Sequence, residues 1–409
     1  MATEPFLPLA RAVARQKGFE DLAVVTIPHP VGGVEAHELD AVLLAATDEI
    51  ERRLTTAPES VQVTATESVL EAPSDASDFF DFAMRSGWGD GLPVLTPDPQ
   101  RVERLVAASG VAPGTSLGAV PPSDRLATIE AVAANAAMSG CEPSVMPVLV
   151  AAVRAVLDPR FNLQAITTTT HPVTPLVVVH GPVVDELGFN SRANVFGQGN
   201  RANATVGRAL RLVLQNIGGA KPGETDRATH GQPGKYAYCI AENAAESPFP
   251  AFHLARVDAV NAVTVFGGEG PHNVNDHGST DAVGVLRNIA GTMATLGCNN
   301  LYMRGEMMVV FSPEHADLCR RAGMDRRDVG AMLQEMARID VRQVSEGNMD
   351  RFISISPEVF SELPEDGTVP VLGDADGALI MVAGGPGKHT MVIPSFGATV
   401  ATTVPIELP

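Results

Sequence analysis

The sequence has little of several features that often reveal a function. Among its 409 residues there are only four cysteines, one tryptophan and three tyrosines. No two of the cysteines are separated by just two residues, so the chain has no CxxC pair of the kind found in redox and zinc sites. Each thiol is therefore expected to be a free, buried, small apolar side chain.

Positive charge is also scarce. The chain has 29 Lys and Arg residues against 48 Asp and Glu residues, which gives a formal net charge of −19. Nucleic-acid binding needs clustered Lys and Arg that displace counterions, and docking on anionic lipid needs the same. We therefore expect neither nucleic acid nor a membrane surface as a partner.

Long apolar runs are missing as well. No apolar stretch approaches the roughly 20 residues of a membrane span. The first residues, MATEPFLPLARAVARQKG, lack the uninterrupted apolar core of a signal peptide. These observations predict a cytoplasmic protein.

What the chain does have is the composition of an ordinary globular protein, with 45% hydrophobic residues. Alternating strand and helix patterns predict an α/β fold: a small incomplete βα module over residues 1–56, a linker over 57–77, and a larger α/β domain over 78–409 with a mixed sheet and a helical N-terminal part. No repeat of fixed period is detectable. Strands are expected at 23–27, 164–169, 175–180, 236–241, 262–266, 307–311 and 378–383. Helices are expected at 6–16, 35–54, 78–87, 99–109, 124–139, 143–157, 203–216, 281–296, 313–323 and 326–339.

The N-terminal module contains one strand and two helices, which is too little for a sheet of its own. A single strand presents unpaired backbone groups on both edges. We therefore expect this strand to pair with the larger domain or with another chain, so that the protein is an oligomer or part of a complex.

The most polar stretch of the chain is GGEGPHNVNDHGST, residues 267–280. It follows an apolar run and precedes a helical pattern, which predicts a strand-to-helix loop, the place where α/β proteins bind ligands. His272, His277 and Asp276 are candidates for acid/base catalysis, and Asn273 and Asn275 are candidates for holding the substrate.

A metal site is the alternative interpretation of the histidines. His171, at the end of a threonine run, together with His272 and His277 would suit zinc or iron. The spacing is not a known metal signature, and HExxH is absent.

Two glycine-rich segments are candidates for anion binding. Residues 195–212 contain Gly197 and Gly199 in a GxGxxA pattern, but no strand precedes it as a nucleotide-binding fold requires. We expect instead an anion-binding corner at the helix start, with Arg201 and Asn203. The turn 383–389 departs from the phosphate-loop pattern, so Gly385 and Lys388 are expected to contribute only a backbone nest for a substrate anion.

Residues 235–247, KYAYCIAENAAES, place Cys239 on an expected strand and Glu242 at its end. Glu242 is a candidate general base, and Cys239 is a candidate nucleophilic or resolving thiol if it is partly exposed. No GxSxG elbow supports a serine hydrolase. The loop GWGDGLP, residues 87–93, is expected to be a tight turn packed by Trp88, or a rim that closes on substrate.

Two parts of the chain resemble known proteins. The segment VTIPHPVGGVEAHELDAVLLAATDEIERRLT resembles the C-terminal half of the UGSC family, (seleno)proteins named for a Sec/Cys-Gly-Ser-Cys motif and similar to the selenoprotein B component of glycine, sarcosine and betaine reductases. The stretches GDGLPVLTPDPQRVERLV, RANATVGRALRLVLQNIGGA, KYAYCIAENAAES and PHNVNDHGST resemble a large uncharacterised bacterial domain that accompanies such modules.

The resemblance implies a reaction and a partner. The residues before the strand at 23–27 contain no cysteine, so the redox motif would come from a separate small Cys/Sec-Gly-Ser-Cys subunit, with an external dithiol or thioredoxin-like reductant. The chain would be the large substrate-binding subunit of an oxidoreductase that cleaves a small polar organic molecule reductively. A metal-dependent hydrolase or lyase, and a scaffold subunit without catalysis, are the alternatives.

Overall fold

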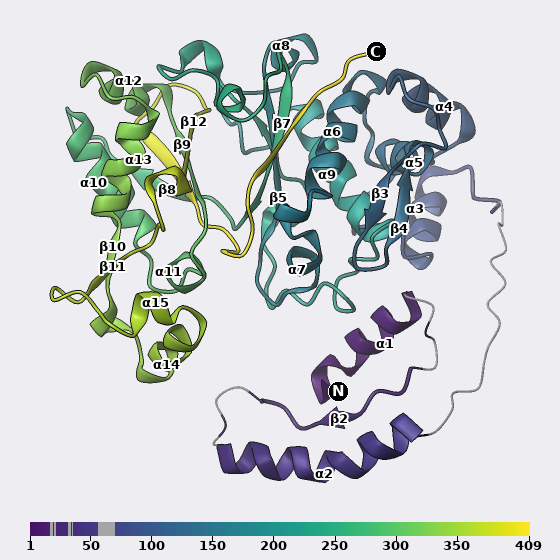
Figure 1. Ribbon diagram of the computed structural model, residues 1–409. Coiled ribbons are helices and arrows are strands. Elements are labelled where there is room, and N and C mark those ends of the chain that lie inside the picture. The colour runs from purple at the N-terminus through teal and green to yellow at the C-terminus, as the bar shows by residue number, and fades with distance from the viewer. Residues whose placement is uncertain (17–18, 20–21, 32–33, 35, 56–69) are drawn as a thin grey trace.

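The computed structural model describes residues 1–16, 19, 22–31, 34, 36–55 and 70–409 (Figure 1). The body of the protein is built on two four-stranded mixed sheets. Sheet I has the order β6-β5-β7-β14, and sheet II has the order β12-β9-β13-β8. The bounds of sheet I are β6 (Cys239–Ala241), β5 (Thr174–His180), β7 (Ala262–Gly268) and β14 (Thr402–Pro405); those of sheet II are β12 (Ala378–Val382), β9 (Met307–Phe311), β13 (His389–Ile393) and β8 (His272–Asn275).

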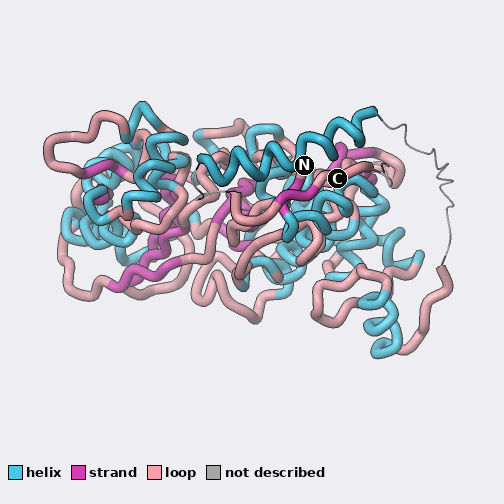
Figure 2. The backbone as a smooth tube through the Cα atoms, turned by 90° about the horizontal axis from the view of Figure 1, so that it is seen from below, coloured by secondary structure: helices cyan, strands magenta, loops and turns pink. Residues whose placement is uncertain are grey.

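The two sheets pack face to face. Strand side chains alternate between faces, and one set from each sheet forms a shared apolar core that includes Val178, Ile240, Phe266, Met308 and Val310. Helices cover the outer faces: α6 (Met146–Val156) and α9 (Arg201–Asn216) on sheet I, with α5 (Ile129–Ser139) packed on α9, and α10 (Ala282–Met293), α12 (Pro313–Arg321) and α13 (Arg326–Met336) on sheet II. Seen from below, the strands run between the two groups of helices (Figure 2). The α/β class predicted from the sequence is confirmed.

The two sheets repeat one topology. In each, a central strand (β5 or β9) is followed by helices, by a parallel edge strand (β6 or β12), and by an antiparallel strand on the other side (β7 or β13). The next strand along the chain then joins the other sheet. β8, which follows β7 of sheet I, pairs with β13 of sheet II, and β14, which follows β13, pairs with β7 of sheet I. The halves therefore exchange their last strands, which ties the two sheets together without any repeat visible in the sequence.

The remaining elements flank this sandwich. A helical N-terminal part with a hairpin lies on the sheet I side, as expected: α3 (Ala76–Arg85), α4 (Pro99–Ala108), β3 (Ser116–Val120) and β4 (Arg125–Thr128). Shorter elements are α7 (Leu163–Thr168), α8 (Val183–Glu186), α11 (Asn300–Met303), α14 (Glu346–Ile355), α15 (Pro357–Phe360), β10 (Arg338–Asp340) and β11 (Thr368–Pro370).

The N-terminal module departs from one expectation. Its strand was expected to pair with the larger domain or with another chain, but it pairs within the module, with a short strand at the start of the chain that was not predicted. The module contains α1 (Leu7–Gln16), α2 (Ala36–Thr55) and a parallel pair of two-residue strands, β1 (Ala2–Thr3) and β2 (Thr26–Ile27). Val25, Ile27 and Ala46 form its own small apolar cluster. Most of the predicted linker at 57–77 lies outside the described residues, and the division into domains stays a prediction.

Three expectations about local structure were wrong. Residues 164–168 lie in helix α7 rather than in a strand, and the hydroxyls of Thr167 and Thr168 donate to the carbonyls four residues earlier, as threonines in helices can do. Residues 125–128 of the expected helix form strand β4. Part of the expected loop 267–280 is strand β8, an edge strand whose pairing with β13 could not be seen locally.

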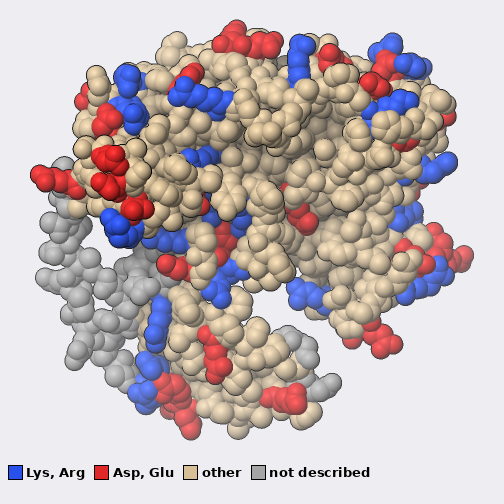
Figure 3. Space-filling view, turned by 180° about the vertical axis from the view of Figure 1, so that it is seen from behind, with Lys and Arg blue, Asp and Glu red and all other residues tan. Residues whose placement is uncertain are grey.

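Charge is distributed in both signs over the surface. On the face in Figure 3, acidic and basic side chains are interspersed, and the N-terminal module stands beside the body. Among the described residues, none of the helices has the length and apolar character that crossing a bilayer would require.

Candidate functional site

A pocket between sheet II and the segment 194–197 collects several of the residues predicted to bind substrate. This glycine-loop pocket has a volume of about 450 Å³ and lies at the carboxyl ends of β9 and β12, where Ser312 and Ala383 follow the strands. Its walls come from four segments far apart in sequence: 194–197, Asn273 of β8, Val310 and Ser312 at the end of β9, and residues between 383 and 391. Gly197, Asn273 and Gly385 are thus brought together, as the sequence predicted for ligand-binding loops.

The two histidines proposed as the catalytic centre are not placed together in this pocket. Val274 is buried against the helices outside sheet II, and in a strand every second side chain shares a face. His272 therefore lies on the helix side, whereas Asn273 and Asn275 lie on the side of the pocket. Neither His272 nor His277 lines the pocket, and both are exposed.

His389 is the imidazole that the glycine-loop pocket does contain. Its Nδ1 lies 3.0 Å from Asn273 Oδ1, and the His277 ring meets it edge-on with centroids 5.3 Å apart. Lys388 Nζ donates to the His277 carbonyl oxygen at 3.1 Å. The polar groups of this pocket are thus neutral amides, hydroxyls and one imidazole, and the rest of its wall is apolar.

The Asp276 side chain binds backbone amides of the following turn and does not line the pocket. It is buried, and its carboxylate accepts from the Gly278 and Ser279 amides and from Asn288 Nδ2 at 2.7 Å. Burial alone would raise the pKa of Asp276, but these hydrogen bonds from Ser279, Asn288 and Gly278 outweigh it and lower the pKa to about 2. The side chain fixes the turn between β8 and α10.

Replacing Asp276 with Asn should lower the free energy of unfolding at pH 7 by about 2–3 kcal/mol, because a carboxylate with a depressed folded pKa stabilises the protein above its unfolded pKa of roughly 4. That contribution is lost as the pH falls from about 4 toward 2, so the difference between wild type and variant should shrink over this range. Urea unfolding at pH 7 and pH 3 measures it. Asp258→Asn, at an exposed position, is the control, and an equal loss in both variants would contradict this role.

The predicted anion-binding corner is occupied by the protein itself. Asn200 caps α9, and Asn203 accepts from the Asn190 amide and donates to the carbonyls of Asn190 and Cys239. Arg201 pairs with Glu142 at 2.5 Å and donates to the Gly140 carbonyl. Gly199 adopts a left-handed conformation in an open position. These side chains position the start of the helix and have their partners within the chain.

His171 belongs to a different part of the surface. Its Nε2 lies 2.9 Å from Glu269 Oε1, and its ring meets Phe396 edge-on. Among the described residues, His171, His272 and His277 do not converge into a metal-binding group; the one such group consists of His180, Glu242 and His253. The alternative interpretation of His171, His272 and His277 as a metal site is therefore wrong.

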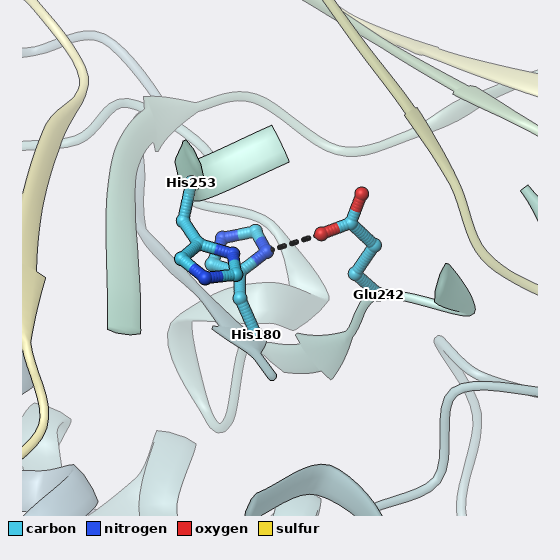
Figure 4. Close-up of side chains that lie close together, drawn as sticks. All are labelled: His180, Glu242 and His253. Carbon is cyan, nitrogen blue, oxygen red and sulfur yellow. Dashed lines mark hydrogen bonds and ion pairs between the residues drawn. The ribbon is translucent and has the colours of Figure 1, made fainter. Parts of the chain in front are cut away.

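Glu242 lies at the end of β6, as predicted, but in a closed environment (Figure 4). Its Oε2 is 2.7 Å from His180 Nδ1, and its oxygens accept from the Phe252 amide at 3.0 and 3.1 Å. The Glu242 and His180 side chains are 1% and 0% exposed, so neither reaches a substrate in solution. Burial raises the pKa of Glu242, but the hydrogen bond with His180 and the nearby charges outweigh it and keep the pKa below its usual value.

The repeated topology relates this cluster to the glycine-loop pocket. The Glu242 amide donates to the carbonyl of Val179 at the end of sheet I, and the Ala383 amide donates likewise to Phe311 in sheet II. Glu242 therefore corresponds to Ala383, and by the same register His180 corresponds to Ser312. In sheet II the space beside Ser312 and Ala383 is the glycine-loop pocket. At the equivalent place in sheet I, the rings of Phe252 and His253 stack on His180.

All four thiols are enclosed. Cys141, Cys239, Cys298 and Cys319 are buried, and burial raises the pKa of each. The values for Cys298 and Cys319 rise to about 11. Since the thiolate is the nucleophile, the geometry does not favour Cys239 as a reactive thiol.

A second cavity, which the sequence analysis missed, holds the charged groups. This lysine pocket has a volume of about 650 Å³, and its wall includes Arg211 of α9, Asp226 and Lys235. Asp226 accepts from Lys235 Nζ at 2.8 Å and from Arg211 Nη2 at 3.0 Å, and the three side chains are 5–15% exposed. Two positive charges thus face one negative charge, and the other carboxylate of the pocket, that of Asp90, is paired with Arg208. With that pair counted as neutral, these groups carry a net charge of +1 in a largely desolvated setting.

Two polar groups of the lysine pocket, Lys235 and Gln232, lack full compensation within the chain. Burial lowers the pKa of Lys235 although Asp226 opposes this, so its ammonium is incompletely compensated. Gln232 also lines the pocket, and its Nε2 is buried with no partner among the described residues. An anion that accepts hydrogen bonds would satisfy both groups.

The loop GWGDGLP forms the rim of the lysine pocket. Asp90 lines the pocket and is held by Arg208 through two bonds of 2.8 Å. Gln215 Nε2 donates to the Gly89 carbonyl at 2.7 Å. Trp88 packs edge-on against Phe82, with ring centroids 5.5 Å apart, as expected for a tight turn packed by this aromatic ring. Asp90 also places the loop at the lysine pocket, and its hydrogen bonds join it to α9.

Comparison with known proteins identifies one part of the chain. Residues 1–56 match the UGSC family, so this segment is a UGSC-family module. No curated protein and no solved structure matches the chain.

Proposed function

We propose that this protein is the substrate-binding subunit of a thiol- or selenol-dependent oxidoreductase and that a small organic anion binds in the lysine pocket. The observation that carries the proposal is that a chain with a UGSC module keeps all its own thiols buried and protonated. The redox group would therefore belong to another chain, whereas this one supplies the only desolvated, net positive cavity described above.

The N-terminal module supports the need for a partner. Among the residues that the structure describes, its sheet consists of the two-residue strands β1 and β2, which leaves backbone edges to which further strands could add. A groove of about 580 Å³ runs between β2 and α2, and Leu44 on α2 is 77% exposed. The small Cys/Sec-Gly-Ser-Cys subunit would complete this sheet by adding strands.

In reductive cleavage, one chain can bind the substrate while another supplies the electrons. A dithiol gives up two electrons and two protons and becomes a disulfide. The two atoms of the substrate bond that breaks take up these electrons and protons. Lys235 and Arg211 would hold the anionic group of the substrate, and the Asp90 loop would limit access of water. The partner would present its thiol or selenol to the bond that breaks.

The test is reconstitution with a small Cys/Sec-Gly-Ser-Cys protein encoded beside this chain. The complex should oxidise dithiothreitol only when the right member of a panel of small carboxylates is present, and Cys239→Ala in this chain should leave that turnover unchanged. Turnover by this chain alone would overturn the proposal. Binding of the carboxylate by a complex that never consumes dithiol would show a scaffold without redox chemistry.

The burial of the thiols gives a direct prediction. In the native protein at pH 8, none of the four cysteines should react with an aromatic disulfide reagent within minutes, because thiolate formation is suppressed and access is blocked. In urea all four should react. A fast-reacting thiol in the native state would restore a redox role for this chain, and mass spectrometry of the labelled peptide would identify it.

A further inference from the structure

The buried cluster of His180, Glu242 and His253 has the features of a metal site. Each residue offers one donor atom, and the three donor atoms lie within 4.8 Å of one another. The residues are 0%, 3% and 2% exposed. They come from β5, from the end of β6 and from the segment between β6 and β7, so they bring together three separate parts of the chain (Figure 4).

The hydrogen bonds of His253 leave a lone pair without a partner. Its Nε2 lies 3.0 Å from the Ala259 carbonyl oxygen, which only accepts, so Nε2 carries the proton. In a neutral ring that is protonated at Nε2, Nδ1 is an acceptor. That Nδ1 is buried and has no hydrogen-bond partner among the described residues. A buried acceptor without a donor is costly, and a cation would satisfy it.

His180 and Glu242 are arranged to share that cation. His180 Nε2 lies 2.9 Å from Thr264 Oγ1, which in turn lies 3.0 Å from Thr403 Oγ1. Histidines that bind metals usually donate their other ring N–H to such an outer acceptor, as both rings can do here. Glu242 is ionised, and its position is fixed by the Phe252 amide.

We propose that His180 Nδ1, His253 Nδ1 and a Glu242 carboxylate oxygen bind one divalent transition-metal ion, with zinc favoured by the two-imidazole, one-carboxylate set. The proton between His180 and Glu242 is displaced when the metal binds. Because the cluster is closed to solvent, the ion acts structurally: it fastens the segment carrying Phe252 and His253 to the end of sheet I. The assignment is independent of the redox function proposed above.

The first test is multi-element mass spectrometry of untagged protein purified without chelators and then loaded with zinc. About one equivalent of zinc is expected in the wild type, and His253→Leu should reduce it to below about 0.1 equivalent. The matched control is His272→Leu, at an exposed position of β8, which should keep its metal. Full zinc in the His253 variant, or less than about 0.1 equivalent of any transition metal in the loaded wild type, would overturn the assignment.

A second measurement needs no variant and so does not depend on its folding. X-ray absorption at the zinc edge should give a shell of nitrogen and oxygen atoms near 2.0–2.2 Å, about the usual zinc distances, with imidazole scattering from two rings. Sulfur in the first shell would contradict the site, because the cluster contains no cysteine. Loss of metal in the wild type with unchanged dithiol turnover would separate this proposal from the redox function.

Discussion

Replacing Lys235 with Met should weaken the binding of small oxyanions by at least about 30-fold, or roughly 2 kcal/mol. Met keeps the length and apolar stem of Lys but removes the charge. In the variant, Asp226 still pairs with Arg211, and the cavity changes from a net charge of +1 to neutral. Calorimetric titration with acetate, succinate and inorganic phosphate measures the change and also distinguishes a carboxylate site from a phosphate site.

The control for this experiment removes one positive charge from the surface beside the glycine-loop pocket. Lys388 lies beside the glycine-loop pocket and donates to a carbonyl there, so Lys388→Met should leave oxyanion binding within about twofold of wild type, as expected for a surface charge. If Lys388→Met abolishes binding and Lys235→Met does not, the ligand belongs to the glycine-loop pocket and the proposal for the lysine pocket fails.

Four strands of the two sheets, including the edge strand β12, could be predicted from the sequence because each is a short, continuous apolar run. β9 was predicted with its observed bounds, and β5, β7 and β12 were predicted within one or two residues, since all four are buried on both faces. The strands that were missed are edge strands or lie next to one. β8 reads HNVN and β14 reads TTVP, and their identity as strands depends on partners more than 100 residues away.

Prediction of the candidate site from the sequence was limited in the same way, by contacts between residues far apart in the chain. That glycine-rich turns would meet at strand ends was predictable, because the carboxyl ends of parallel strands share one edge. Which histidine would face the pocket was not, since moving by one residue along β8 turns a side chain to the opposite face. His389 takes the place expected of His272 because β13 pairs with β8 in a register that the sequence does not reveal.

The charged groups of the lysine pocket were missed for a related reason. Arg211 falls on a helix whose pattern looks like an ordinary amphipathic surface, and Asp226 and Lys235 lie in loops rich in Gly and Pro. Nothing local marks them as a cluster. One available signal was Arg211 itself, which interrupts the otherwise apolar run Leu210 to Leu214, because a charge there must find a buried partner.

Asp226 is expected to be the side chain whose loss destabilises this region most. Asp226→Ala should lower the free energy of unfolding by about 3–5 kcal/mol, because it leaves two buried cations, Arg211 and Lys235, facing each other without a counter-charge. The matched control is Asp317→Ala, which also breaks contacts with two basic residues but at the surface of α12. It should cost no more than about 1 kcal/mol. Urea unfolding of the three proteins at pH 7 provides the comparison.

A double variant tests whether repulsion between the two cations causes that loss. In Asp226→Ala combined with Lys235→Met, one of the two uncompensated charges is gone, so the double variant should be more stable than Asp226→Ala alone by about 1–3 kcal/mol. If both substitutions simply removed packing contacts, their costs would add, and the double variant would be the least stable of the set. Additive losses would therefore show that the lysine pocket does not hold an uncompensated charge, and its role as an anion site would lose its physical basis.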